Sequence, residues 1–70
     1  MAPDPSFWQR WKPSKKSLSA VLYGLRDGRA MTPAELAADL RMRKIAVCRA
    51  LDRLLISGEV SMEGGRYRRA

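Results

Sequence analysis

The sequence predicts a small α+β domain in which three helices are followed by a C-terminal β-hairpin. Three observations support this fold class. Leucine and valine recur at helical spacing in separate segments of the chain. A Thr-Pro-Ala-Glu sequence that begins at Thr32 marks the start of a helix. Near the C-terminus, two short strand-like segments flank the pair Gly64-Gly65, which favours a tight turn.

The first helix is expected over residues 17–26, at the start of a domain that covers residues 17–70. Its apolar residues fall at i, i+3, i+4 and i+7, which places Leu18, Val21, Leu22 and Leu25 on one face. Either Ser14 or Ser17 can cap its N-terminus, because a serine hydroxyl accepts a hydrogen bond from a free backbone N–H. The helix is expected to end near Asp27-Gly28, since glycine readily adopts the left-handed conformation.

The second helix is expected over residues 33–40, with Leu36 and Leu40 on its inner face. Thr32 and Glu35 have the spacing of a capping box, in which each side chain bonds the backbone N–H of the other residue. Pro33 falls at the first helical position, where its missing N–H is not needed.

The third helix is expected over residues 43–57, and Gly58 should end it. Val47, Leu51, Leu54 and Leu55 form its inward stripe, with Ile45 at the edge of that stripe. The hairpin follows over residues 59–69. The expected core consists of apolar residues from all these elements: Leu18, Val21, Leu22, Leu25, Leu36, Leu40, Val47, Leu51, Leu54 and Val60.

Composition narrows the classes of function. The chain has 14 Lys and Arg against 7 Asp and Glu, which gives a formal charge of +7. This charge indicates a polyanionic partner, such as nucleic acid or an anionic membrane surface. The alternative is that the charge only keeps the protein soluble. It has no histidine and a single cysteine, Cys48, so we expect no disulfide, no metal site, no cofactor and no catalytic activity. No apolar run is long enough to cross a membrane and no secretory signal is evident, so we expect a cytoplasmic protein.

Residues 31–69 resemble the winged helix-turn-helix domains of bacterial and phage transcription regulators. Four features carry the resemblance: the cap Thr32-Pro33-Ala34-Glu35, the leucine spacing of the two following helices, the exit Ser57-Gly58-Glu59-Val60, and the wing Gly64-Gly65-Arg66-Tyr67. The turn Arg41-Met42-Arg43 departs from the family pattern, because it lacks the glycine and the small polar cap that are often found there. The resemblance implies that residues 29–31 pair with the wing as a third strand.

The resemblance also implies a function and a binding site. The protein would bind double-stranded DNA as a small, sequence-preferring transcriptional regulator, with its third helix in the major groove and its wing on the backbone. The implied base contacts are Lys44, Ala46, Arg49 and Ala50; Arg49 suits guanine, and Ala46 suits a thymine methyl group. The implied backbone contacts are Thr32, Arg41, Arg43, Arg53, Arg66 and Arg68. The protein would be associated with the nucleoid when it is bound to DNA.

Residues 1–16 are interpreted as a basic and aromatic N-terminal arm. Its residues Trp8, Arg10, Trp11 and Lys12 could pack on the first helix, form a dimer interface, follow DNA or contact an anionic lipid surface. Two alternative functions remain open: a protein-interaction module anchored by the tryptophans, and a nucleic-acid binder without sequence preference. A homodimer or a partner protein would strengthen the weak contact that one short helix makes. No small-molecule substrate is indicated.

Overall fold

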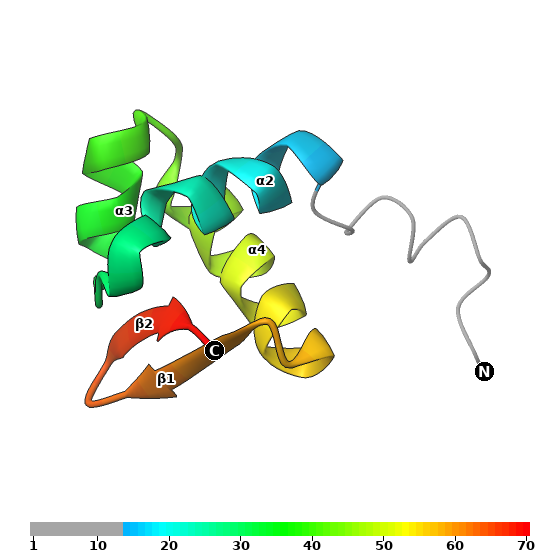
Figure 1. The fold of residues 1–70 in the computed structure, drawn as a ribbon. Helices are drawn as coiled ribbons and strands as arrows, with labels where there is room; N and C mark the ends of the chain where they lie inside the picture. Colours follow the sequence, from blue (N-terminus) through cyan, green and yellow to red (C-terminus); the bar gives the residue numbers. More distant parts are fainter. Residues whose placement is uncertain (1–13) are drawn as a thin grey trace, which may run out of the picture.

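The computed structural model describes residues 14–70, which form three helices and a two-stranded antiparallel hairpin (Figure 1). The elements are α2 (Lys15–Gly24), the 3-10 turn η1 (Arg26–Gly28), α3 (Pro33–Leu40), α4 (Lys44–Ser57), β1 (Val60–Glu63) and β2 (Arg66–Arg69). The predicted α+β fold class is therefore confirmed, and the arrangement is consistent with a winged-helix layout.

Helix α2 begins and ends slightly earlier than predicted. Ser14 is its N-cap, because the Ser14 hydroxyl accepts a hydrogen bond of 3.1 Å from the Ser17 backbone N–H. Lys15 and Lys16 therefore belong to the helix and not to the arm. After Gly24 the chain continues as the single turn η1, in which Asp27 (φ 62°) and Gly28 (φ 73°) are left-handed and stop the helix.

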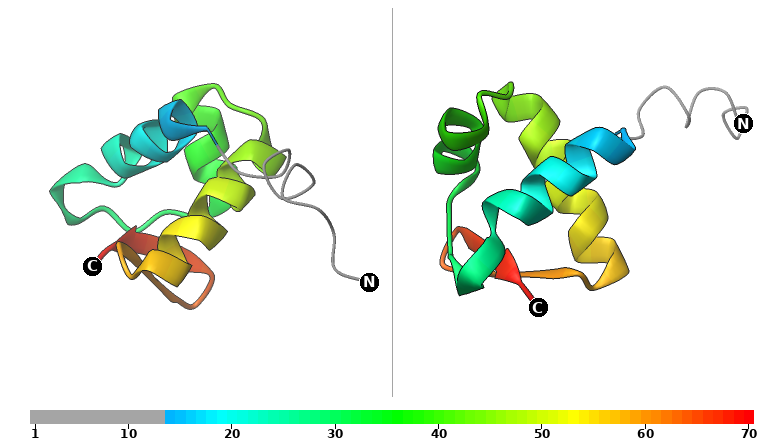
Figure 2. Two further views of the ribbon diagram at one scale, coloured as in Figure 1. Left: turned by 90° about the vertical axis from the view of Figure 1, so that its right-hand side faces the viewer. Right: turned by 45° about the horizontal axis from the view of Figure 1, so that its top comes forward.

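The three helices pack against one another, and β1 packs against α4 (Figure 2). The close approach of α2 to α3 depends on Gly24. A Cβ atom at this position would lie 2.8 Å from Cδ2 of Leu36 and 3.3 Å from both Cδ atoms of Leu40. The missing side chain therefore lets the end of α2 rest directly on two leucines of α3.

Helix α3 is fixed at both ends by local hydrogen bonds. The predicted capping box is present: the Thr32 hydroxyl accepts from the Glu35 N–H at 3.2 Å, and Glu35 Oε1 accepts from the Thr32 N–H at 3.0 Å. At the other end Arg41 is left-handed, with φ 54° and ψ 44°. The Met42 N–H bonds the Ala37 carbonyl at 3.0 Å, which completes a Schellman-type end without a glycine.

The hairpin has the predicted turn at Gly64-Gly65, and both glycines have positive φ. Its register pairs Val60 with Arg69 and Met62 with Tyr67. Met31 adds one antiparallel bridge, in which its N–H and carbonyl bond Tyr67 at 2.9 and 2.8 Å. Residues 29–31 thus join the sheet through a single residue and do not form a third strand.

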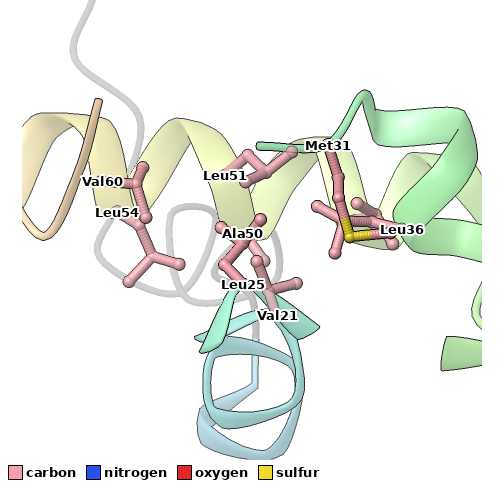
Figure 3. Close-up of a cluster of buried hydrophobic side chains, with 9 residues drawn as sticks. Val21, Leu25, Met31, Leu36, Ala50, Leu51, Leu54 and Val60 are labelled. Carbon is pink, nitrogen blue, oxygen red and sulfur yellow. The ribbon is translucent and has the colours of Figure 1, made fainter. Parts of the chain in front are cut away.

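The core lies between the three helices and the base of the hairpin (Figure 3). Its buried side chains are Val21, Leu25, Met31, Leu36, Val47, Ala50, Leu51, Leu54 and Val60. Leu18, Leu22 and Leu40 were also predicted in the core; they pack against it while remaining partly exposed. Met31 and Ala50 are core residues that the sequence pattern did not indicate.

Candidate nucleic-acid interface

The turn between α3 and α4 gathers three exposed cations, which we call the turn cluster: Arg41, Arg43 and Lys44. Arg41 is the left-handed residue that ends α3, Arg43 is the N-cap of α4, and Lys44 is the first residue of α4. The ion pairs seen between described residues are Arg26–Asp27 and Arg66–Glu35. Within residues 14–70, no carboxylate therefore forms an ion pair with the turn cluster.

The N-terminus of α4 is electrostatically unusual. Arg43 provides no side-chain cap, and the first turn contains no acidic residue. The backbone N–H groups of a helix start carry a partial positive charge, and a cation beside them is unfavourable by roughly 0.3–1 kcal/mol. Two cations lie here. An anion at this position would interact favourably with the free N–H groups, the helix dipole and the turn cluster together.

The outward face of α4 combines polar and apolar side chains. Asp52, Arg53 and Ile56 are exposed, and Ile45 is 57% exposed in the first turn. The expectation that Ile45 lies at the edge of the core stripe is therefore wrong. Among the predicted base contacts, Lys44 is exposed, while Ala46 and Arg49 are half-buried.

Ala50 corrects the predicted base-contact set. Its side chain is 0% exposed and belongs to the core cluster (Figure 3). It lies three residues after Val47 and four before Leu54, which is the spacing of one helix face, and both of those residues are buried. The Ala50 side chain has no exposed surface that could contact a base, so the predicted base contact by Ala50 is wrong.

The N-terminus of α3 is less suited to a phosphate than the sequence suggested. The N–H groups of Thr32 and Glu35 are bonded within the capping box, and Pro33 has no N–H. The backbone N–H of Thr32, followed by the Thr32 side chain and the Arg66 guanidinium, lowers the pKa of Glu35 below its ordinary value of 4.5. A phosphate bound to Thr32 would face this ionised carboxylate.

On the hairpin, Arg66 holds the wing against the start of α3. Its Nη1 donates to Glu35 Oε1 at 3.0 Å and to the Ala30 carbonyl at 3.3 Å. Arg68 lies on the same outer face of the hairpin, because alternate residues of a strand point the same way. The two arginines line a shallow pocket of about 130 Å³ together with Ala30, Ser61 and Glu63. Arg66 therefore has a structural role in addition to its predicted role as a backbone contact.

Arg53 is exposed on α4. The arm residues Trp8, Arg10, Trp11 and Lys12 lie outside the described residues. Within residues 14–70, no three metal-ligating side chains come together. None of the helices in that range is long and apolar enough to cross a bilayer.

No protein-family model, curated protein or solved structure matches the chain. The assignment of a function therefore depends on the geometry and charge of the described residues.

Proposed function

We propose that the protein binds double-stranded DNA and acts as a small, sequence-preferring transcriptional regulator. One observation carries the proposal: Arg41, Arg43 and Lys44 are exposed around an uncapped helix N-terminus that directly follows a helix–turn unit. Cations and free N–H groups at one place complement the phosphate backbone, which supplies most of the affinity of such complexes.

In this proposal the N-terminal half of α4 enters the major groove, which is wide enough to admit a helix. The turn cluster would bind the phosphates at the groove edge and thereby set the depth and register of the helix. Arg53 would contact the backbone further along α4, and Arg68 would contact it from the hairpin. The Arg49 guanidinium would donate hydrogen bonds to the major-groove edge of a guanine.

Fluorescence anisotropy of a labelled duplex at several salt concentrations tests the proposal. The variant Arg43→Ala/Lys44→Ala removes two charges from the turn cluster. The control variant Lys15→Ala/Lys16→Ala removes two exposed lysines from the start of α2, which Figure 1 shows away from the turn. Each lost phosphate contact reduces the slope of log K against log salt by about 0.9, so the turn variant should lose roughly 1.8 and the control much less.

Two results would contradict the proposal. One is the absence of duplex binding even at low salt. The other is an equal loss of slope in the turn variant and in the control, because it would show that net charge alone, and not the turn cluster, attracts the DNA. A matching affinity for every duplex sequence would instead indicate a nucleic-acid binder without sequence preference.

A protein-interaction module is the second candidate function, and the apolar surface of α4 favours it. Ile45 and Ile56 are 57% and 79% exposed, and exposed apolar side chains are common anchors of protein interfaces. The two tryptophans, Trp8 and Trp11, provide a readout. A change in their emission on addition of a protein, with no change on addition of duplex DNA, would favour this function.

A further inference from the structure

Ile45 differs from the other exposed apolar side chains of the described residues, Tyr23, Ile56 and Met62, because it lies next to the turn cluster in the sequence. It lies in the first turn of α4, beside Lys44 and close in sequence to Arg41 and Arg43, yet it is 57% exposed. Exposure of this much apolar surface is unfavourable in water. The turn cluster of exposed cations thus also has an exposed isoleucine beside it.

We propose that Ile45 contacts the 5-methyl group of a thymine in the major groove and gives the protein a preference for thymine at that position. This inference rests on the proposed function. The thymine methyl is the apolar group that the major groove exposes, and an aliphatic side chain is its natural partner. The neighbouring cations would hold the phosphates that flank this base.

Ile45 is better placed for this contact than Ala46, the residue for which the family resemblance implies a thymine methyl contact. Ala46 is half-buried and has a single methyl group, whereas Ile45 is exposed and extends further from the helix axis. A residue in the first turn of a helix that enters the groove by its N-terminus is also among the first to reach the base edges.

Ile56 provides a matched control on the same helix. It lies eleven positions after Ile45, and at about 100° per residue both side chains point outward on nearly the same face. Ile56 is even more exposed, at 79%, but its surroundings differ. The adjacent Ser57 hydroxyl donates to the Glu59 carboxylate at 2.9 Å, and the C-terminus of a helix carries a partial negative charge, so this end of α4 suits a phosphate less well than the helix start does.

The test compares thymine with deoxyuridine, which lacks only the 5-methyl group. A tightly bound duplex is first selected from a random library, and each of its thymines is then replaced in turn by deoxyuridine. We expect one replacement to weaken binding of the unaltered protein about three- to fivefold, the value for one buried methyl group. Ile45→Ala should show no loss at that position, Ile45→Val a smaller loss, and Ile56→Ala the full loss.

The outcomes separate this inference from the proposed function. If the duplex binds but Ile45→Ala keeps the full loss at every replaced thymine, another residue reads the methyl group and the inference is overturned. It is overturned equally if no thymine shows a loss. If no duplex binds at all, both the proposed function and this inference are overturned. Because Ile45 is exposed, we expect the melting temperature of Ile45→Ala to match that of the unaltered protein, which excludes misfolding as the cause.

Discussion

Replacing Arg41 with glycine is expected to stabilise the fold while weakening its binding to duplex DNA. Arg41 ends α3 in the left-handed conformation, with φ 54° and ψ 44°. This conformation costs an L-residue about 1–2 kcal/mol, while glycine adopts it freely and is preferred at this position of a helix end. Glycine also increases the entropy of the unfolded chain, which returns about 0.4–1 kcal/mol.

The difference between these two effects is a net gain of about 0.8 kcal/mol in the free energy of unfolding at the midpoints of the two ranges. In a domain of this size the gain corresponds to a rise of about 3–6 °C in melting temperature. The effect on DNA has the opposite sign, because glycine removes a cation of the turn cluster. Loss of one phosphate contact should reduce the slope of log K against log salt by about 0.9.

Two further substitutions separate conformation from charge. Arg41→Lys keeps the charge and the strained backbone, so both the melting temperature and the salt slope should stay close to those of the unaltered protein. Arg41→Asn removes the charge but tolerates the left-handed conformation, so it should lose DNA binding as the glycine variant does. Thermal unfolding followed by circular dichroism and anisotropy titration at several salt concentrations provide the two readouts.

The reasoning would be refuted if Arg41→Gly lowered the melting temperature, because the arginine would then make a stabilising contact that outweighs its backbone strain. A salt slope that is unchanged in Arg41→Gly would refute the binding half alone and remove Arg41 from the interface.

Two other predictions concern the packing of α2 and the cap of α3. Gly24→Ala should lower the free energy of unfolding by about 0.5–2 kcal/mol, because the gain in helix propensity is smaller than the cost of overpacking by a Cβ placed 2.8 Å from Leu36 Cδ2. Urea denaturation measures this change in the free energy of unfolding. A stabilised variant would contradict the prediction and show that the Leu36 side chain moves aside freely. Glu35→Gln should be less stable than the unaltered protein at neutral pH, because the folded state lowers the pKa of Glu35 and so stabilises its ionised form. That difference should shrink as the pH falls below 4.5 and through the folded pKa, and a difference that persists when Glu35 is protonated would contradict this origin.

Features that depend on near neighbours in the sequence were predicted well. The Thr32–Glu35 capping box, the alternative N-cap Ser14 and the turn at Gly64-Gly65 each involve residues at most three positions apart. Their hydrogen bonds follow from local backbone geometry, and the tertiary structure does not alter them. The bounds of α3 and the end of α4 followed from the same signals, whereas α2 begins and ends two residues earlier than predicted.

Features that depend on how the elements pack could not be predicted. Gly24 reads as a weak helix residue in the sequence, and only the approach of α3 shows why a side chain is excluded there. The Arg66–Glu35 ion pair joins residues that are 31 positions apart. Ala50 has the helical spacing of the core residues Val47 and Leu54, but alanine is small enough to suit either face of a helix, so residue type alone did not assign it to the core.

Three departures from the usual local rules fall together between Arg41 and Ile45, although a left-handed Asp27 and an exposed Ile56 show that single departures also occur elsewhere. An arginine takes the left-handed position, Arg43 leaves the start of α4 uncapped, and Ile45 is exposed to solvent. Helices α2 and α3, by contrast, have regular side-chain caps at their N-termini. A missing cap lowers the free energy of unfolding by about 1 kcal/mol, and a left-handed arginine lowers it by a similar amount. This segment therefore does not have the sequence that would make the free protein most stable.

Such departures are expected where a site serves binding. A phosphate at the start of α4 would bond the free N–H groups and offset the charge of the turn cluster at the same time, and a base methyl group would cover Ile45. The missing cap, the cations beside the helix start and the exposed isoleucine, which are unfavourable in the free protein, would then each make a favourable contact in the complex. A protein partner could cover Ile45 as well, but an apolar surface would leave the three cations and the uncapped amides without an anion. The charge of this segment, more than its exposed isoleucine, is therefore what favours DNA as the partner.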